Sequence, residues 1–520
     1  MDSDTMQPKM IGDGGASISI RMENRIASSI MEKLEIRAPS GRCSIHRVPE
    51  RFHKMRKPSA YKPGVVSIGP YHRANQSLKA TEDLKLLYAR KLLTVTVRAR
   101  RESSKLYALT VEEEEEDLFA IVDECVSSVT EMETEIRMCY SESVEPDSNK
   151  FVEMMIIDGL FIIKMLIRYT LGSYYIADDP LDGNDWLLMI VQQDMFLLEN
   201  QIPLFVLQCL AKIIINVEES GHTYLNKVIH SFIINGKLSY ISPANQILLE
   251  ELLNRCENAY HLLDFFIKLV QPPDPVDSAS SLKTVQIPTR LKTNTVVKFT
   301  ISQYSFLKSF IHNLFTKLKR TCITDEEREN PSDTSTDFFL PSATELSLAG
   351  VRFKKGSAQG SFLDIKFNRR TGILKIPPLC IYDETDPLLR NVIACEQSCG
   401  GGYHITSYVT MMDFLINSAD DVKLLRKEEI ISNYLGCDED VSEMFNKLCV
   451  GIILDSTYYS NYINDINKFY KKRWHRWKAT LKREYFNSPW AIVSVLAAIL
   501  VIALTIISTV FGILSFVFHK

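Results

Sequence analysis

The chain has 520 residues, 46% of them hydrophobic and 24% charged, which suffices for one large core or two cores of ordinary size. Its formal net charge of −4 argues against a general affinity for nucleic acid, and its 11 scattered cysteines favour a reducing compartment over a compact disulfide framework. The polar start MDSDTMQPKMIGDGG lacks the apolar stretch of a cleavable signal peptide.

Residues 1–40 predict a disordered start, rich in Gly, Ser and Asp, that ends in a short amphipathic helix. The next stretch, residues 44–72, is basic and aromatic and contains four prolines. Because proline breaks the interior of a helix, we expect this stretch to be extended and to lie on another part of the chain.

The predicted head, residues 41–485, shows mainly the apolar spacing of helices. The stretch 151–169 is apolar nearly all round, which predicts a buried helix, and Pro203 predicts the start of another helix. The remaining predicted helices occupy 78–101, 112–140, 222–235, 243–254, 256–270, 342–350, 386–398, 404–417, 420–427, 439–452 and 462–485.

Two stretches of the head depart from helical spacing. Residues 271–340 are polar and rich in Pro, Ser and Asp, which predicts a variable linker. In residues 351–381, short apolar runs alternate with Gly and Asn turns, which predicts a small antiparallel β-meander. The predicted fold class is therefore mainly α with a small antiparallel β-meander (α+β), completed by a single C-terminal transmembrane helix.

Residues 490–518 contain no charged side chain and no proline, and about 20 apolar residues are enough to span a bilayer. We therefore predict a single-pass protein anchored through its C-terminus in the plasma membrane or an endomembrane, with membrane lipid as a partner. The basic residues before the span favour a cytosolic head. Glycosylation of Asn75, in the sequence Asn-Gln-Ser, would instead imply an extracellular or lumenal head. Small residues in the span leave pairing into a homo-oligomer open.

An aromatic and basic stretch precedes the predicted span. Apolar residues recur at three- and four-residue steps from Ile463 to Tyr485, and this stripe could lie on the membrane or pack against the head, which we favour. Such a stretch can bind nucleic acid, but its place beside a span favours anionic lipid, so we expect no nucleic-acid partner. The predicted membrane-interface residues are Lys471, Lys472, Arg473, Trp474, Arg476, Trp477 and Trp490.

Asp158, Asp194 and Glu199 lie in apolar surroundings, where an ionised carboxylate must be paired or hydrogen-bonded, or else takes up a proton. Two such groups could perform general acid-base catalysis. They could equally anchor the basic stretch 47–51 onto the helical core or cap helix ends, as Asn200 could, and we favour structural ion pairing. The candidate structural and interaction residues are Arg47, Arg51, Asp158, Asp194, Glu199 and Asn200.

The spacing of Cys395, Cys399 and His404 suggests a zinc site, but such a site needs four ligands, and Cys380 and Cys437 both remain open as the fourth. We favour buried thiols that behave as small apolar side chains. Because no catalytic, phosphate-binding or dinucleotide-binding motif is recognisable, we expect no catalytic residue, no cofactor and no metal ion.

Several further stretches carry a family resemblance. They are IHRVPERFHKM from Ile45, YKPGVVSIGPYH from Tyr61, MMIIDGLFII from Met154, QQDMFLLENQIPLFVL from Gln192, SATELSLAGVRFK from Ser342, and the later LDIKF, ILKIPPL, LLRNVIACEQ and ITSYVTMMDFLINSADDVKLLRKEEII, with the end FYKKRWHRWKATLKREYFNSPWAIVSVLAA. Their order resembles the plant domain of unknown function 247 over about residues 45–518. The resemblance implies a plant origin, one mainly helical domain, a C-terminal anchor and no established enzymatic activity. Some members encoded at grass self-incompatibility loci are regarded as pollen-side recognition determinants.

These observations predict a membrane-anchored, non-enzymatic protein that recognises or signals to an unidentified protein partner. One alternative is a pollen-side self-incompatibility determinant. The other is a membrane-tethered enzyme that uses Asp158, Asp194 and Glu199.

Overall fold

The structure, a computed structural model, is described here over a defined set of residues. These are 28–31, 43–55, 58–103, 110–145, 147–171, 181–215, 221–235, 249–272, 339–357, 361–400, 402–454, 457–471, and, near the C-terminus, 497, 500–502, 504, 505 and 508.

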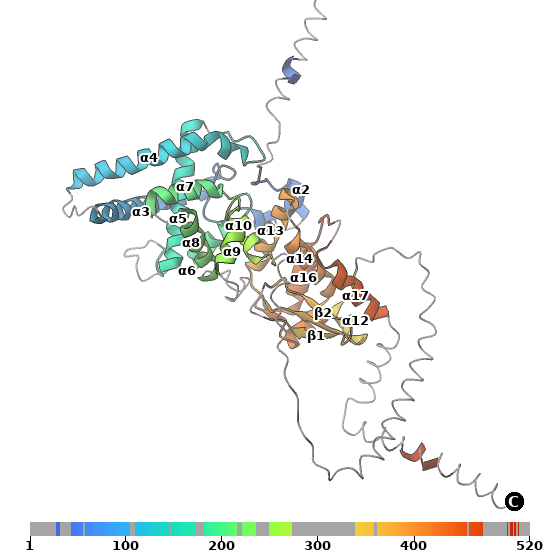
Figure 1. The fold of residues 1–520 in the computed structure, drawn as a ribbon. Helices are drawn as coiled ribbons and strands as arrows, with labels where there is room; N and C mark the ends of the chain where they lie inside the picture. The colour runs from blue at the N-terminus through green and yellow to red at the C-terminus, as the bar shows by residue number, and fades with distance from the viewer. Residues whose placement is uncertain are drawn as a thin grey trace, which may run out of the picture.

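The described chain is mainly helical, as the apolar spacing predicts, and Figure 1 shows two groups of helices. The first group and the elements before it are α2 (Glu50–Met55), η1 (Pro58–Tyr61), η2 (Gln76–Thr81), α3 (Glu82–Ser103), α4 (Val111–Met138), α5 (Ser148–Leu171), α6 (Asp185–Asp194), α7 (Leu204–Ile215), α8 (Gly221–Asn235), α9 (Leu249–Arg255) and α10 (Leu262–Val270). The second group is α12 (Ala343–Leu348), α13 (Thr385–Cys399), α14 (His404–Leu415), α15 (Ala419–Lys427), α16 (Asp438–Leu448) and α17 (Ser460–Lys471).

The core of the first group is built around α5, which packs against α3, α4, α7 and α8. Its apolar residues are buried nearly all round, as expected for a helix without a polar face. Gly159 lets α7 approach closely, because a Cβ there would lie 2.4 Å from Leu210 Cδ1. Helices α3 and α4 lie side by side as a long pair that reaches away from the rest of the molecule (Figure 1).

Local sequence signals fix several helix ends. Thr110 and Glu113 form a capping box at the start of α4, and the acidic run that follows complements the positive end of the helix dipole. Ser342 and Glu345 form a second capping box at the start of α12. At the predicted end of that helix, the cap is Ala349, and Gly350 follows with a φ of 99°.

The predicted antiparallel meander is wrong in its pairing. Strands β1 (Arg352–Lys355), β2 (Lys366–Asn368) and β3 (Ile373–Ile376) form a sheet of order β1-β3-β2, in which β1 and β3 are parallel and only β2 and β3 are antiparallel. A separate parallel pair joins β4 (Leu379–Ile381) to β5 (Ile431–Asn433). The long return between β1 and β3 brings the chain back to the same end of the sheet, so the pairing is mixed rather than a meander.

The last helix of the head packs against the sheet. Ile463, Ile466 and Phe469 of α17 are buried, and α17 contacts β2. The Phe469 ring lies over Gly372, where a Cβ would come within 2.4 Å of it. The part of the apolar stripe within α17 therefore faces the head.

The predicted C-terminal transmembrane helix requires a correction, and with it the single-pass membrane localisation. Among the residues that the structure describes, no helix is both long enough and apolar enough to cross a membrane. Most of residues 490–518, on which this prediction rested, lie outside the described residues, and so does most of the predicted linker 271–340.

Candidate functional site

The basic, proline-containing stretch, here called the N-terminal segment (residues 44–73), lies against the junction of the two helix groups. Among its described residues the segment carries the short helical elements α2 and η1 and no long helix, which agrees with its prolines. Ile45, Tyr61, Val66 and Ile68 are almost fully buried, so the segment is part of the core. Beneath it lies a set of buried polar groups, here called the polar clamp (Asp158, Asp194, Glu199, Asn200).

Three elements position the polar clamp. Asp158 lies on α5 and Asp194 is the last residue of α6. Glu199 and Asn200 lie in the turn between α6 and α7, which Pro203 closes before α7 begins at Leu204. The Gln201 amide holds this turn by donating to the carbonyl oxygens of Met195 and Leu197, both at 2.8 Å.

Asp194 binds three consecutive backbone amides of the N-terminal segment. Its Oδ1 accepts from Gly64 N, and its Oδ2 accepts from Val65 N and Val66 N, all at 2.8 Å. Burial raises the pKa of Asp194 to about 6, although these three N–H donors favour the ionised form. The carboxylate therefore supplies the hydrogen-bond acceptors that these backbone N–H groups would otherwise find on a neighbouring strand.

Asn200 continues this arrangement along the segment. Its Oδ1 accepts from Ile68 N at 2.7 Å, and its Nδ2 donates to Val66 O at 3.0 Å and to Asp194 O at 2.9 Å. Asn200 is fully buried, and both ends of its side chain are satisfied. It acts as a bridge between the segment and the end of α6.

Asp158 is paired with a lysine at the centre of the site. Lys85 Nζ on α3 lies 2.7 Å from Asp158 Oδ1, and both side chains are fully buried. Asp158 Oδ2 accepts from Gly69 N at 2.8 Å, and Arg73 NH1 lies 3.3 Å from Oδ1. Lys85 also donates to the Ser67 carbonyl oxygen. The Lys85–Asp158 pair therefore binds the segment at two places, Ser67 O and Gly69 N.

Glu199 contacts two imidazoles of the N-terminal segment. Its Oε1 accepts from Val48 N at 2.8 Å and lies 3.2 Å from His53 Nε2, while its Oε2 lies 3.2 Å from His72 Nε2. Burial raises the pKa of Glu199, but the hydrogen bonds from His72 and Val48 and the charge of His72 outweigh burial, so that the net shift is downward. These contacts favour the ionised carboxylate.

The two predicted arginines behave differently. Arg47 lies 3.9 Å from Glu199 Oε2 and makes a closer pair with Glu142, at 2.8 Å. Arg51 is exposed on α2 and makes no ion pair with the three carboxylates in the described structure. The N-terminal segment is therefore anchored to the three carboxylates mainly by its backbone amides, and less by Arg47 and Arg51.

Among the residues of the site that escaped prediction are Lys85 and Asn391. Lys85 falls on the face of α3 that carries Tyr88 and Leu92, and a lysine in line with an apolar stripe is the signal that could have found it. Asn391 on α13 donates to Ala60 O at 2.7 Å and accepts from Leu198 N at 2.9 Å. No local pattern marks it, because its partners are far away in the sequence.

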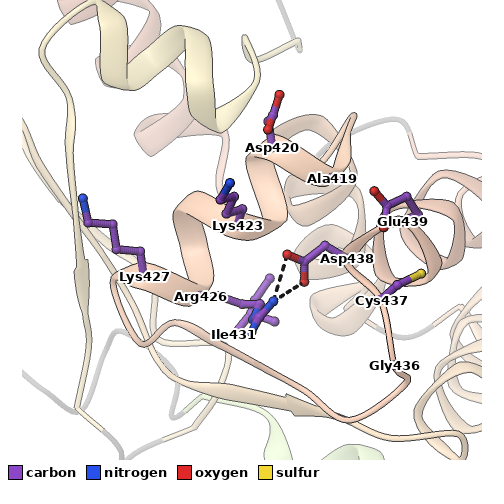
Figure 2. Close-up of a pocket in the computed structure, with 10 residues that line it drawn as sticks. All are labelled: Ala419, Asp420, Lys423, Arg426, Lys427, Ile431, Gly436, Cys437, Asp438 and Glu439. Atoms are coloured by element: carbon purple, nitrogen blue, oxygen red, sulfur yellow. Dashed lines mark hydrogen bonds and ion pairs between the residues drawn. The ribbon is translucent and has the colours of Figure 1, made fainter.

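A surface pocket of about 620 Å³ lies elsewhere, between α15 and the start of α16. Figure 2 shows Arg426 reaching across it to Asp438, with both carboxylate oxygens within 2.9 Å. Lys423 and Lys427 line the same pocket with Asp420 and Glu439. It contains none of the polar clamp residues, and its charges are mixed.

The other predicted sites are placed as follows. Asn75 is exposed, and its side chain caps η2 by accepting from Ser77 N at 3.1 Å. Lys471 is exposed at the end of α17, whereas the other predicted membrane-interface residues lie outside the described residues. In the described parts of the chain, no three His, Cys, Asp or Glu side chains are grouped to hold a metal ion.

Comparison with known proteins agrees with the plant resemblance. The chain is 28% identical over 508 residues to UPF0481 protein At3g47200 of Arabidopsis thaliana, covering 96% of this chain and 92% of the relative. It is 25% identical over 499 residues to Putative UPF0481 protein At3g02645 of the same plant, covering 89% and 88%. No solved structure matches the chain. The pattern that defines DUF247, described as plant protein of unknown function, matches residues 45–504, so the chain belongs to this family.

Proposed function

We propose that this chain is a non-enzymatic protein-recognition component and that the outer face of α4 is its recognition surface. The observation that carries the proposal is the one-sided packing of α4. Its inner face buries Ile121, Cys125, Val129 and Ile136 against neighbouring helices. Its outer face presents apolar side chains among acids over a helix of 28 residues.

The outer face combines an aromatic anchor with negative charge. Phe119 is 73% exposed and Val126, seven residues later on the same side of the helix, is 40% exposed. Exposed acids on this outer side include Glu112, Glu116 and Asp123. Large aromatic side chains are frequent energetic centres of protein interfaces, and surrounding charges select the partner by complementarity.

The chemistry of the face favours one kind of partner. A helix that carries Lys or Arg beside an apolar stripe would place its stripe on Phe119 and Val126 and its charges beside the acids of α4. The projecting α3–α4 pair leaves this face accessible along its length (Figure 1). We therefore expect a basic amphipathic helix of another protein.

The geometry of the polar clamp supports a non-enzymatic role. Asp158, Asp194 and Glu199 direct their oxygens at backbone amides and cations of this chain, with none directed into the surface pocket between α15 and α16. A general acid or base needs an oxygen within reach of a substrate proton. These carboxylates serve to hold the N-terminal segment.

Photo-crosslinking tests the proposal. A photoreactive residue placed at Phe119 in the full chain, expressed in plant tissue, should capture a protein through a basic helix. The purified protein should bind the chain saturably in calorimetry, with affinity that falls as salt increases. Phe119→Ala should weaken binding by at least about tenfold, the effect of losing about 1.4 kcal/mol.

The matched control is Trp186→Ala, which removes another exposed aromatic residue, 69% exposed on α6. The Trp186→Ala variant should bind the partner protein with the same affinity as the unaltered chain. Equal affinity of the Phe119→Ala variant would contradict the proposal, as would saturable turnover of a substrate that is lost on substitution of Asp158 while the fold persists. A role as a pollen-side self-incompatibility determinant is a special case, which requires polymorphism on this face that co-segregates with pollen rejection.

A further inference from the structure

Thiols and imidazoles gather where the N-terminal segment begins and α13 ends. Cys395 and Cys399 lie four residues apart on α13, and Cys399 is its last residue. Cys43 precedes Ser44 and His46 follows it by two residues, and Cys399 Sγ lies 3.5 Å from the Ser44 carbonyl oxygen. These four side chains, Cys43, His46, Cys395 and Cys399, are called the thiol cluster here.

A neutral histidine holds the backbone of the cluster in place. His261 Nδ1 accepts from Asp264 N at 3.3 Å, so the ring proton is on Nε2, which donates to Ser44 O at 3.2 Å. Burial lowers the pKa of His261, consistent with a neutral ring. His261 therefore holds Ser44 O by a hydrogen bond, and the start of the segment lies against Cys399 at the end of α13.

Access differs among the three cysteines. Cys399 is exposed, Cys43 is half-buried and Cys395 is only 2% exposed. Cys399 is therefore the most accessible of the three to a small oxidant. Cys395 lies behind it and interacts with it through a side-chain hydrogen bond.

The neighbours of Cys399 favour its thiolate. The hydrogen bond from Cys395 and the interaction with His46 lower the pKa of Cys399 to about 5 against the effect of burial. The interaction with Cys399 in turn raises the pKa of His46 against the effect of burial, so that imidazolium and thiolate stabilise each other. Burial raises the pKa of Cys43, which stays a thiol at neutral pH. A thiolate beside a histidine is the reactive form of cysteine.

We propose that Cys399 is a hydroperoxide-reactive nucleophile and that Cys43 is its resolving thiol. The Cys399 thiolate attacks one oxygen of the hydroperoxide, the O–O bond breaks, and the departing oxygen takes a proton and leaves as an alcohol or water. Cys399 becomes a sulfenic acid. The Cys43 sulfur then attacks the Cys399 sulfur, the S–O bond breaks, and hydroxide takes up the Cys43 proton and leaves as water. Two thiols are oxidised to one disulfide and the peroxide is reduced.

Geometry favours Cys43 over Cys395 as the resolving thiol. Residues four apart on a helix have Cβ atoms about 5–6 Å apart, whereas a disulfide needs about 3.5–4.5 Å. Cys43 lies on irregular backbone next to the residue that Cys399 already contacts. The disulfide would join the beginning of the N-terminal segment covalently to α13.

Alkylation of the reduced full chain tests the nucleophile. Iodoacetamide at pH 6, with peptide mass spectrometry as the readout, should label Cys399 at least about tenfold faster than Cys437, because a thiolate reacts and a thiol does not. Cys437 is the matched control, since it is also exposed, but hydrogen bonding to Asp440 raises its pKa. His46→Gln should move the pH midpoint of Cys399 labelling upward. Equal labelling of the two cysteines would overturn the proposal.

Peroxide treatment tests the resolving step. One equivalent of hydrogen peroxide should produce a Cys43–Cys399 disulfide, and Cys43→Ser should instead accumulate a sulfenic acid that dimedone traps at Cys399. Cys399→Ser should abolish both products, and Cys437→Ser should change neither. A Cys395–Cys399 disulfide in the unaltered chain would overturn the assignment of Cys43. Absence of any oxidised Cys399 would overturn the whole proposal.

Discussion

At the scale of single residues, the site depends on buried charges that are satisfied by groups far away in the sequence. Asp158 and Lys85 are both fully buried and are separated by 73 residues. The sequence shows that the Asp158 carboxylate is unusual in an apolar helix, but it does not show that Lys85 is the partner. The prediction that such carboxylates need partners follows from solvation, whereas the identity of each partner depends on packing that no local pattern encodes.

Removing the cation should expose the dependence of Asp158 on Lys85. Lys85→Met leaves a buried carboxylate with only the more distant Arg73 as a charged partner, and we expect a loss of about 3–5 kcal/mol in the free energy of unfolding. Urea denaturation measures this loss. Lys79→Met, at an exposed lysine near the start of the same helical region, is the control and should change stability by less than about 0.5 kcal/mol. A similar stability for both variants would contradict the buried pair.

Glu199 should support the fold in acid. Its pKa is lowered in the folded chain, so the unfolded chain binds more protons below the ordinary glutamate pKa, and stability falls as pH decreases through that range. The stabilisation is complete above about pH 4.5. Glu199→Gln should therefore flatten the decline of unfolding free energy below pH 4.5, measured by urea denaturation across a pH series. An unchanged slope in this range would show that Glu199 is not ionised in the clamp.

Asp194 should have the opposite dependence in a different range. Its pKa is raised to about 6 by burial, so the folded chain binds more protons between the ordinary aspartate pKa and pH 6, and stability falls as pH rises through this window. Asp194→Asn should remove this slope, which for one proton is at most about 1.4 kcal/mol per pH unit. The same denaturation series reports it. If the free energy of unfolding of the Asp194→Asn variant still falls between pH 4 and 6, the dependence belongs to another titrating group.

At the scale of elements, periodicity predicts the helices well and strand pairing poorly. The apolar residues of α5 and α14 mark the extents of these helices, because helical spacing is visible in residues only three and four positions apart. The direction of β1 relative to β3 depends on contacts far away in the sequence, such as the hydroxyl of Tyr459, which donates to Leu363 O at 2.6 Å just before β2. Alternating apolar runs therefore located the sheet without giving its pairing.

The docking of the N-terminal segment onto the turn after α6 depends on the absence of a side chain at Gly69. Its φ is 69°, and a Cβ there would lie 2.6 Å from Gln201 O, a backbone atom that cannot rotate away. Gly69→Ala should destabilise the chain by at least about 2 kcal/mol, through backbone strain plus this overlap. Thermal and urea unfolding measure the change.

Gly183→Ala is the matched control for that substitution. Gly183 has a similar φ of 77° but no heavy atom within 4 Å of the added Cβ. It should lose only about 1–2 kcal/mol from the left-handed backbone. An equal loss in both variants would mean that the segment is not held tightly against Gln201.

At the scale of the whole molecule, one continuous cluster of buried apolar residues runs through both helix groups. Helix α10 of the first group packs against α13 of the second, and α13 also packs against η1 of the N-terminal segment. Asn391 lies at this meeting point and binds Ala60 and Leu198, residues of the segment and of the first group. We therefore expect the two groups to unfold as one cooperative body, with the segment packed between them.

Asn391→Ala should weaken that junction. It leaves Leu198 N and Ala60 O buried without this partner, and each unsatisfied group costs about 1–3 kcal/mol. We expect a single unfolding transition shifted by about 3 kcal/mol, measured by denaturation with two spectroscopic probes. Asn446→Ala, at an exposed asparagine of α16, is the control. Two separate transitions in the unaltered chain would contradict a single cooperative body.

The position of the polar clamp along the chain has a consequence for biosynthesis. The N-terminal segment leaves the ribosome first, yet the groups that bind it, from Asp158 to Asn391, are translated later. Its apolar residues Ile45, Tyr61 and Val66 therefore lack part of their packing partners until α13 has emerged. A nascent chain in this state offers a hydrophobic stretch to cotranslational chaperones, and premature termination before residue 391 leaves that stretch without its full set of partners.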